Sequence, residues 1–257
     1  MADGEPVITA PAMKRKNSDL GTRLISAIVM MAVAWAALWL GGWVWICFVI
    51  LLAGMVLWEW NNLVRLFNIS ALAEVVWQFF GAVYVGGAAF AMILVRNGPQ
   101  VAPVGGQTYG FTDLETLVGF VLPIVAVDVG AYFAGRAIGG PKIAPSISPS
   151  KTWAGYFGGA IAASGVTVTI ELLDLGPAAS SPGYSAYSLF GAVVAGFLIA
   201  ALAQGGDFFE SWMKRRAGVK DSSALIPGHG GFFDRLDGFI AVFFVLFLVA
   251  LAPGILG

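Results

Sequence analysis

Acidic and basic side chains gather in one stretch of an otherwise apolar chain, residues 205–238. Asp207, Asp234 and Asp237 lie where two apolar runs meet this stretch. Carboxylates from neighbouring helices suit a hard cation such as Mg²⁺, which leaves further positions for water and phosphate oxygens. Lysine and arginine side chains between the acids supply the positive charge that a phosphate group needs. The stretch indicates metal-assisted chemistry on a phosphorylated substrate, although ion sites of transporters use the same residue types.

Four polar residues of this stretch recur at a helical spacing. Asp207, Glu210, Ser211 and Lys214 stand at positions i, i+3, i+4 and i+7, so a helix would carry them on one face. A charge within a membrane span costs at least about 2.5–3.5 kcal/mol, and such acids usually face a bundle interior or a water-filled cavity. The alternative that stays open is a segment that has left the membrane, with its charges solvated.

A glycine-rich loop precedes the last apolar run. Gly230 and Gly231 come just before a predicted helix that begins with Asp234 and Asp237, again on one face. Glycine has no Cβ, so its backbone amide can approach an anion closely. His229 is the only histidine and the chain has a single cysteine, so we expect no zinc site. For His229, the roles of phosphate donor, acid–base group and loop-structuring residue stay open.

A second polar segment follows the fourth apolar run. Asp128 and Arg136 stand at i and i+8 and share a helical face. Ser148 precedes a proline, which predicts a helix start with Ser148 as N-cap. Lys151 and Thr152 then fall in the first turn, where free backbone amides favour an anion. Arg136 and Lys151 fit equally well as anchors at the membrane interface.

The elements that must position these residues are membrane spans. The chain has 257 residues, 58% of them hydrophobic and 11% charged, against about 25% charged in soluble domains. We therefore predict an all-α, polytopic transmembrane helical bundle of about seven spans, or eight or nine if a helix is broken. The predicted spans are 24–40, 43–58, 76–95, 116–138, 154–172, 187–209 and 238–256.

The predicted organisation is a short tail and one membrane domain. Residues 1–22 are polar and are expected to form a mobile cytoplasmic tail, and residues 23–257 form the integral membrane catalytic domain. Its site comes mainly from 128–155 and 205–238. Glu59 closes the second span and either joins this site or marks the membrane boundary. The segments 97–113 and 174–186 are expected to be loops.

The basic residues predict the topology. With a cytoplasmic N-terminus and seven alternating spans, only Arg96 of the 14 lysines and arginines falls outside. Both polar segments then lie on the cytoplasmic face. A bacterial inner membrane is the expected location. The net charge of −1 gives no indication of a nucleic acid partner.

The spacing of residues 211–237 closely resembles the signature of the phosphatidate cytidylyltransferase (CDP-diacylglycerol synthase) family. The resemblance extends to Asp207, to the sequence "SPSKTWAG" at 148–155, to the span that contains Asp128 and to the polytopic layout. Ala154 departs from the pattern, in which an acidic or amide residue is expected. The matching positions are Ser211, Lys214, Arg215, Lys220, Asp221, Pro227, His229, Gly230, Gly231, Asp234, Arg235 and Asp237.

The resemblance implies a Mg²⁺-dependent reaction of CTP with phosphatidate that yields CDP-diacylglycerol and pyrophosphate in the membrane. It implies that Asp207, Asp234 and Asp237 hold the metal, and whether a second cation joins them stays open. Asp221 would either hold a basic neighbour or join the metal site. The implied catalytic residues are Asp207, Ser211, Lys214, Arg215, Lys220, Asp221, His229, Asp234, Arg235 and Asp237, and the implied phosphate-binding residues are Ser148, Lys151, Thr152, Lys214, Arg215, Lys220, Arg235, Gly230 and Gly231.

Several alternatives stay open beside this expectation. Glu59, Asp128, Arg136 and Glu210 are candidates for accessory roles at the site. A related CTP-dependent lipid kinase would use similar residues, and an ion-coupled transporter would use the acids as a relay. A scaffold without activity is a further alternative, and a homodimer is an open question.

Overall fold

The computed structural model describes residues 16–98, 114–173 and 186–251, and these ranges form seven α-helices and no strand. Each helix overlaps one of the seven predicted apolar runs, which confirms the all-α prediction. Residues 1–15 of the predicted tail and most of the two predicted loops lie outside the described residues. The helices are α1 (Lys16–Leu40), α2 (Gly42–Arg65), α3 (Ala71–Asn97), α4 (Leu114–Ala137), α5 (Trp153–Leu172), α6 (Ala186–Ala217) and α7 (Phe233–Ala250).

Five of these helices are long and apolar enough to cross a membrane. They are α1 from Gly21 onward, α2, α3, α4 and α6 from Ser188 onward. Large apolar side chains such as Trp43, Phe79 and Phe133 are exposed on them, and so wide an apolar surface suits lipid rather than water. The chain is therefore a helical membrane protein, while the count of seven spans and the cytoplasmic N-terminus stay predictions.

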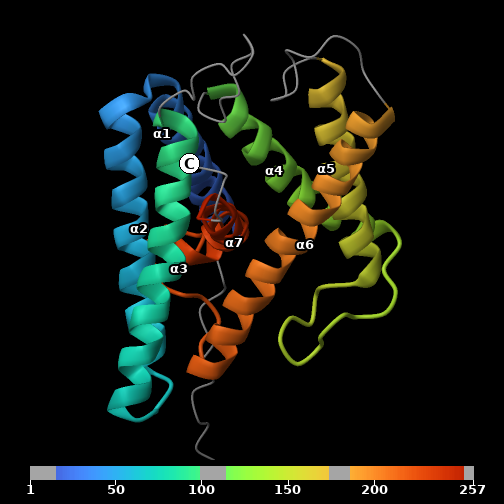
Figure 1. Cartoon of the computed structure of the whole chain (residues 1–257). Coiled ribbons are helices and arrows are strands. Elements are labelled where there is room, and N and C mark those ends of the chain that lie inside the picture. Colours follow the sequence, from blue (N-terminus) through green and yellow to red (C-terminus); the bar gives the residue numbers. More distant parts are fainter. Residues whose placement is uncertain (1–15, 99–113, 174–185, 252–257) are drawn as a thin grey trace, which may run out of the picture.

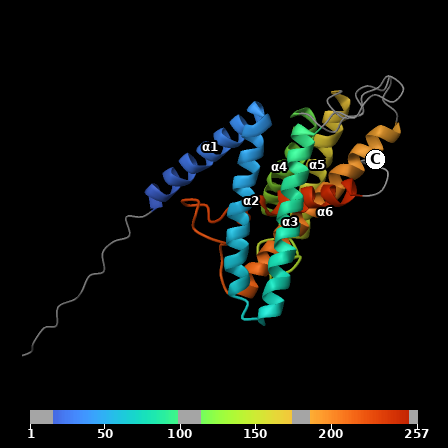
Figure 2. The same ribbon diagram turned by 60° about the vertical axis from the view of Figure 1, so that its left-hand side comes forward.

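The helices form two groups that α7 connects. The helices α2 and α3 stand side by side, and α4, α5 and α6 pack together on the other side (Figure 1). The last helix, α7, is seen end-on between them in Figure 1 and crosses α3 in Figure 2. It packs against both α3 and α6, so its N-terminal turn lies where the two groups meet. The first helix, α1, leans away from the bundle (Figure 2).

An aromatic cluster fixes this meeting point. Trp60 of α2 is fully buried. Its ring centroid lies 5.8 Å from that of Phe209 on α6, 5.7 Å from Phe233 on α7 and 6.1 Å from Tyr84 on α3. Its indole N–H donates a hydrogen bond to the Trp77 carbonyl at 3.0 Å. Buried aromatic groups of this size contribute much of the packing energy of a core, so four helices are held in register here.

One glycine brings α6 and α7 into close contact. A Cβ added to Gly206 would lie 2.5 Å from the Asp237 carbonyl oxygen and 2.6 Å from the Ala241 Cβ. Only a residue without a side chain fits such a helix crossing. The next residue after Gly206 is Asp207, so the crossing places that carboxylate beside the start of α7.

Several helices extend beyond the predicted apolar runs, and the extensions of α2 and α6 carry charged residues of the site. The second helix continues to Arg65, so Glu59 lies inside it and is fully buried. The sixth continues to Ala217 and carries Glu210 and Lys214 beyond the predicted end at 209. Hydropathy marks the apolar part of a helix, whereas hydrogen bonding continues into polar turns.

Candidate metal and phosphate site

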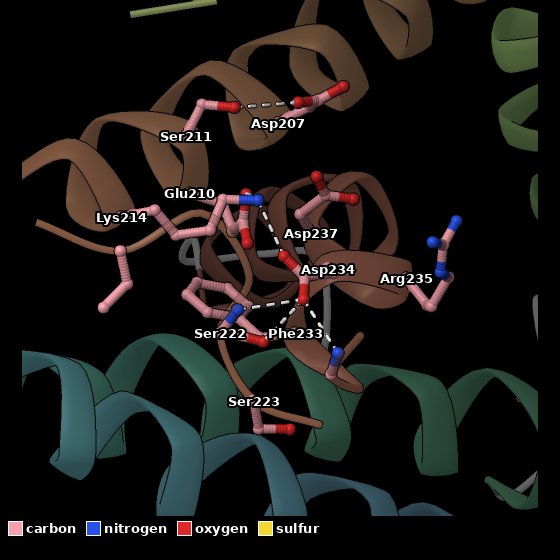
Figure 3. A network of polar contacts seen from close by, with 12 residues as sticks. Asp207, Glu210, Ser211, Lys214, Ser222, Ser223, Phe233, Asp234, Arg235 and Asp237 are labelled. Carbon is pink, nitrogen blue, oxygen red and sulfur yellow. Dashed lines mark hydrogen bonds and ion pairs between the residues drawn. The ribbon is translucent and has the colours of Figure 1, made fainter. Parts of the chain in front are cut away.

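Three carboxylates converge at the crossing of α6 and α7. Asp207 and Glu210 on α6 and Asp237 on α7 each offer one oxygen, and these oxygens lie within 4.8 Å of one another. The i, i+3 spacing puts the first two on one face of α6, and Asp237 faces them from the second turn of α7 (Figure 3). The structure thus brings the predicted Asp207 and Asp237 together, with Glu210 as the third member.

The surroundings of the Glu210 carboxylate indicate whether a cation fits between the three acids. Glu210 is almost fully buried, and its Oε2 lies 2.7 Å from the Lys214 ammonium. Its Oε1 is buried with no hydrogen-bond partner in the part of the chain that the structure describes. A buried acceptor without a partner costs about 1–3 kcal/mol, and more when it is charged. A hard cation prefers carboxylate oxygens, so three acids this close together, one of them only partly compensated, fit a divalent metal ion.

Asp234 lies outside this trio and has other partners. Its Oδ1 accepts a hydrogen bond from the Lys214 Nζ at 2.7 Å. Its Oδ2 accepts from the Ser222 amide at 3.0 Å and the Gly231 amide at 2.8 Å (Figure 3). The Ser222 hydroxyl lies 3.0 Å from the same oxygen and can donate its one proton either to Asp234 or to Glu59. The sequence grouped Asp234 with the metal ligands, but here it joins Lys214 to the loop before α7.

Glu59 organises the same loop from the opposite side. Its Oε1 accepts hydrogen bonds from the Ser223 hydroxyl at 2.6 Å and the Phe232 amide at 2.9 Å. Its Oε2 accepts from the Ser222 hydroxyl at 2.9 Å and the Phe233 amide at 2.7 Å. Phe232 is the N-cap of α7 and provides no side-chain cap, so Glu59 of α2 satisfies the first amides of α7 instead.

Lys151 connects the second polar segment to the acids. Its ammonium forms an ion pair with the Asp207 carboxylate and lies 4.5 Å from the centroid of the Phe208 ring. A β-bridge between Lys142 and Thr152 keeps this segment extended before α5. Lys151 is therefore the residue of this segment that the structure brings directly to the carboxylate trio.

The predicted helix start in this segment is wrong by four residues. The N-cap of α5 is Thr152, whose hydroxyl accepts a hydrogen bond from the Gly155 amide at 3.1 Å. Ser148 lies buried in the loop before it. Both residues match the N-cap preference, and the β-bridge decides between them because it holds Lys151 and Thr152 out of helical geometry.

The fourth helix adds one acid to the site. Asp128 interacts electrostatically with Asp207 and Lys151. Further along the same face, the exposed Arg136 donates to the Tyr132 hydroxyl at 3.5 Å, and the described residues place no acid of the trio beside it. Asp128 therefore belongs to the surroundings of the trio, and Arg136 lies apart from it.

Two arginines of the predicted site stabilise loops. Arg235 donates two hydrogen bonds to the His229 carbonyl, at 3.2 and 2.7 Å. Arg215 donates to the Ile147 carbonyl at 3.3 Å and thereby joins the end of α6 to the loop before α5. Lys220 and Asp221 are exposed in the turn after α6.

The two glycines before α7 permit the loop to close on the carboxylates. Gly230 has a φ of +86°, and an added Cβ there would lie 2.8 Å from the Asp234 Oδ2. A Cβ on Gly231 would lie 2.6 Å from the Glu59 Oε1. Both positions therefore require glycine because of the neighbouring carboxylates.

His229 lies against the first helix. Its Nδ1 is 2.9 Å from the Ser26 hydroxyl, and that hydroxyl also donates to the Pro227 carbonyl at 3.2 Å. These contacts suit the loop-structuring role. Sequence reasoning passed over Ser26, Ser222 and Ser223, because a serine in a loop or a span has no distinctive spacing.

Comparison with known proteins gives a consistent result. Residues 71–252 match the model of the cytidylyltransferase family. The phosphatidate cytidylyltransferase of Brucella melitensis is 34% identical over 261 residues, which cover 90% of this chain and 93% of that protein. The enzyme of the same name from Rickettsia bellii is 27% identical and covers 93% of this chain and 94% of its own length. That of Bacillus subtilis is 34% identical over 202 residues, 78% of this chain and 67% of that protein.

Proposed function

This chain belongs to the cytidylyltransferase family, and we propose that it converts CTP and phosphatidate to CDP-diacylglycerol and pyrophosphate. An oxygen of the phosphatidate phosphate forms a bond to the α-phosphorus of CTP. The bond from that phosphorus to the bridging oxygen breaks, and pyrophosphate leaves with the electron pair. The observation that carries the proposal is the similarity to phosphatidate cytidylyltransferases over 90% of the chain.

The proposed cofactor is Mg²⁺, held by Asp207, Glu210 and Asp237. The closeness of the three carboxylates supports this assignment, as does the Glu210 Oε1, for which the described part of the chain provides no hydrogen-bond partner. Held there, Mg²⁺ would supply positive charge against the phosphate oxygens and the departing pyrophosphate. In this proposal Asp234 is not a ligand, because its oxygens already accept hydrogen bonds from Lys214, Ser222 and Gly231.

Lys151 and Lys214 have different roles at the proposed site. Phosphatidate already carries an anionic oxygen, so the protein has to position it and neutralise charge rather than remove a proton. Lys151 pairs with Asp207 at the edge of the trio, where its ammonium can hold a phosphate oxygen. Lys214 is held between Glu210 and Asp234, so it balances the charge of the site from within.

The experiment that tests the activity uses two labelled forms of CTP. The purified protein in detergent receives phosphatidate, Mg²⁺ and CTP labelled at either the α- or the γ-phosphate. Transfer of the α-label to lipid supports the proposal, and transfer of the γ-label would indicate a lipid kinase instead. If neither label appears in the lipid fraction, the proposed function is contradicted. The named relatives are all cytidylyltransferases, so the kinase and transporter alternatives receive no support from them.

We also propose that the protein lies in a bacterial inner membrane with its site facing the cytoplasm. The distribution of basic residues supports this orientation. CTP would then arrive from the cytoplasm and phosphatidate from the inner leaflet. A reporter fused after residue 180 is expected to report the outside, and a cytoplasmic signal there would contradict the orientation.

A further inference from the structure

We propose that Glu59 is a positioning residue for cytidylyl transfer, an inference that rests on the function proposed above. It lies on α2, outside residues 71–252 that match the family model. Through the loop of Ser222 and Ser223 and the first turn of α7, its carboxylate sets where Asp237 stands relative to Asp207 and Glu210. Glu59 is not itself a ligand or a catalytic group in this proposal.

The contacts of Glu59 require a carboxylate at this position. The residue is fully buried, and each of its two oxygens accepts one hydrogen bond from a serine hydroxyl and one from a backbone amide. A serine hydroxyl can rotate and accept instead, but the amides of Phe232 and Phe233 can only donate. A glutamine would direct its NH₂ group at one of these amides in either orientation. The negative charge also complements the N-terminal end of the α7 dipole.

A chain of short contacts leads from Glu59 to the carboxylate trio. The Ser222 hydroxyl lies 2.9 Å from Glu59 and 3.0 Å from Asp234. Asp234 in turn lies 2.7 Å from the Lys214 ammonium, which is 2.7 Å from Glu210. The carboxylate on α2 is thus connected to Glu210 on α6 through the loop and α7.

The hydrogen bonds between Glu59 and the first amides of α7 also position Asp237 through the backbone of that helix. Glu59 accepts hydrogen bonds from the first amides of α7, and Asp237 follows one turn later on that helix. Loss of these bonds would let the first turn of α7 fray or shift. A displacement of about 1 Å at a reacting centre can lower the rate about 100-fold.

The test compares Glu59→Gln with Gln78→Ala. Gln78 of α3 donates a hydrogen bond to Asn61 of α2 at 2.9 Å, so its loss removes a polar contact of α2 without touching the loop. For Glu59→Gln we expect kcat to fall about 10–100-fold while the KM for CTP changes little, because Lys151 is undisturbed. Gln78→Ala is expected to lower the melting temperature and keep the wild-type kcat.

A double mutant and two smaller substitutions complete the design. If Glu59 and Ser222 act as a unit, adding Ser222→Ala to Glu59→Gln causes little further loss of kcat. If Glu59→Gln does not fold, the serine variants decide. Ser222→Ala is expected to lower kcat more than Ser223→Ala, because only Ser222 also contacts Asp234.

The outcomes separate this inference from the proposed function. A wild-type kcat in Glu59→Gln, or in Ser222→Ala where the first variant does not fold, would overturn the inference while the activity stands. The same holds if Gln78→Ala loses as much kcat as Glu59→Gln, since the effect would then be general destabilisation. A wild-type protein that makes no CDP-diacylglycerol would contradict the proposed function itself.

Discussion

Two groups of carboxylates meet near the start of α7, and they differ in how their oxygens are used. Eight donor contacts reach the oxygens of Glu59 and Asp234, and two of them share the single proton of the Ser222 hydroxyl. In the trio of Asp207, Glu210 and Asp237, the Glu210 Oε1 is buried with no hydrogen-bond partner among the described residues.

The difference separates acids that build the site from acids that are available to a ligand. A buried carboxylate is tolerated when donors or cations compensate the loss of water. For Glu59 and Asp234 the protein supplies these donors itself. For the trio the compensation is incomplete, which leaves room for a divalent cation. Asp234 and Asp237 are one turn apart on α7 and yet fall into different groups.

Asp237→Asn is expected to have the largest effect of the substitutions in the two groups. We expect turnover to fall about 10³-fold, because a lost metal ligand removes several kcal/mol of transition-state stabilisation. The melting temperature is expected to stay close to that of the wild type, since the substitution relieves repulsion among three neighbouring acids. Initial rates and a thermal melt in detergent measure both. A variant that turns over normally would remove Asp237 from the site.

Asp234→Asn is expected to lower stability more, and activity less, than Asp237→Asn does. An asparagine keeps one acceptor but presents an NH₂ group to Lys214 or to the loop donors, which costs about 1–3 kcal/mol of stability. Activity should fall less than in Asp237→Asn. Reversible unfolding in detergent, compared between the two variants, measures the difference. An unchanged stability would show that the Asp234 contacts contribute little.

Lys151, at the edge of the trio, should affect the reaction more than Lys142, which forms the β-bridge with Thr152. Lys151→Ala is expected to lower kcat/KM about 10–100-fold, the value of a charge-assisted contact of 1.5–3 kcal/mol. The matched control is Lys142→Ala, because Lys142 is exposed and, within the described ranges, its ammonium donates to the Ser150 carbonyl at 3.4 Å rather than to an acid of the trio. Equal losses in the two variants would indicate a general effect of positive charge.

The smallest expected effect comes from the contact with α1. Ser26→Ala removes the hydroxyl that contacts His229 and the Pro227 carbonyl, at a cost of about 1 kcal/mol. A small fall in stability with nearly normal turnover is the expected result of melts and initial rates. A large loss of turnover would instead assign His229 a direct part in the reaction.

Much of the fold could be predicted because hydropathy and helical period act locally. The seven apolar runs all became helices, and the stripe of Asp207, Glu210 and Lys214 lies on one face of α6. The i, i+3 spacing of Asp234 and Asp237 was also right about the helix. It could not predict that Asp237 lies with Asp207 and Glu210 while Asp234 contacts Lys214, because the rotation of α7 depends on its packing at Gly206.

The part that could not be predicted depends on contacts between distant residues. Glu59 and its partners Ser222 and Phe233 are separated by more than 160 residues, so the spacing around Glu59 carries no trace of its role. Thr152 replaced Ser148 as N-cap because a β-bridge holds the segment extended. In both cases a local preference was compatible with two arrangements, and tertiary contacts selected one.

Binding of Mn²⁺, measured by electron paramagnetic resonance on the purified protein without substrates, shows whether the trio of Asp207, Glu210 and Asp237 holds a divalent ion. Mn²⁺ prefers the same oxygen ligands as Mg²⁺ and reports binding without any turnover. We predict that the wild type and Asp234→Asn bind the ion, whereas Asp207→Asn and Asp237→Asn do not. Equal binding by the wild type and Asp237→Asn would contradict a metal site built from Asp207, Glu210 and Asp237.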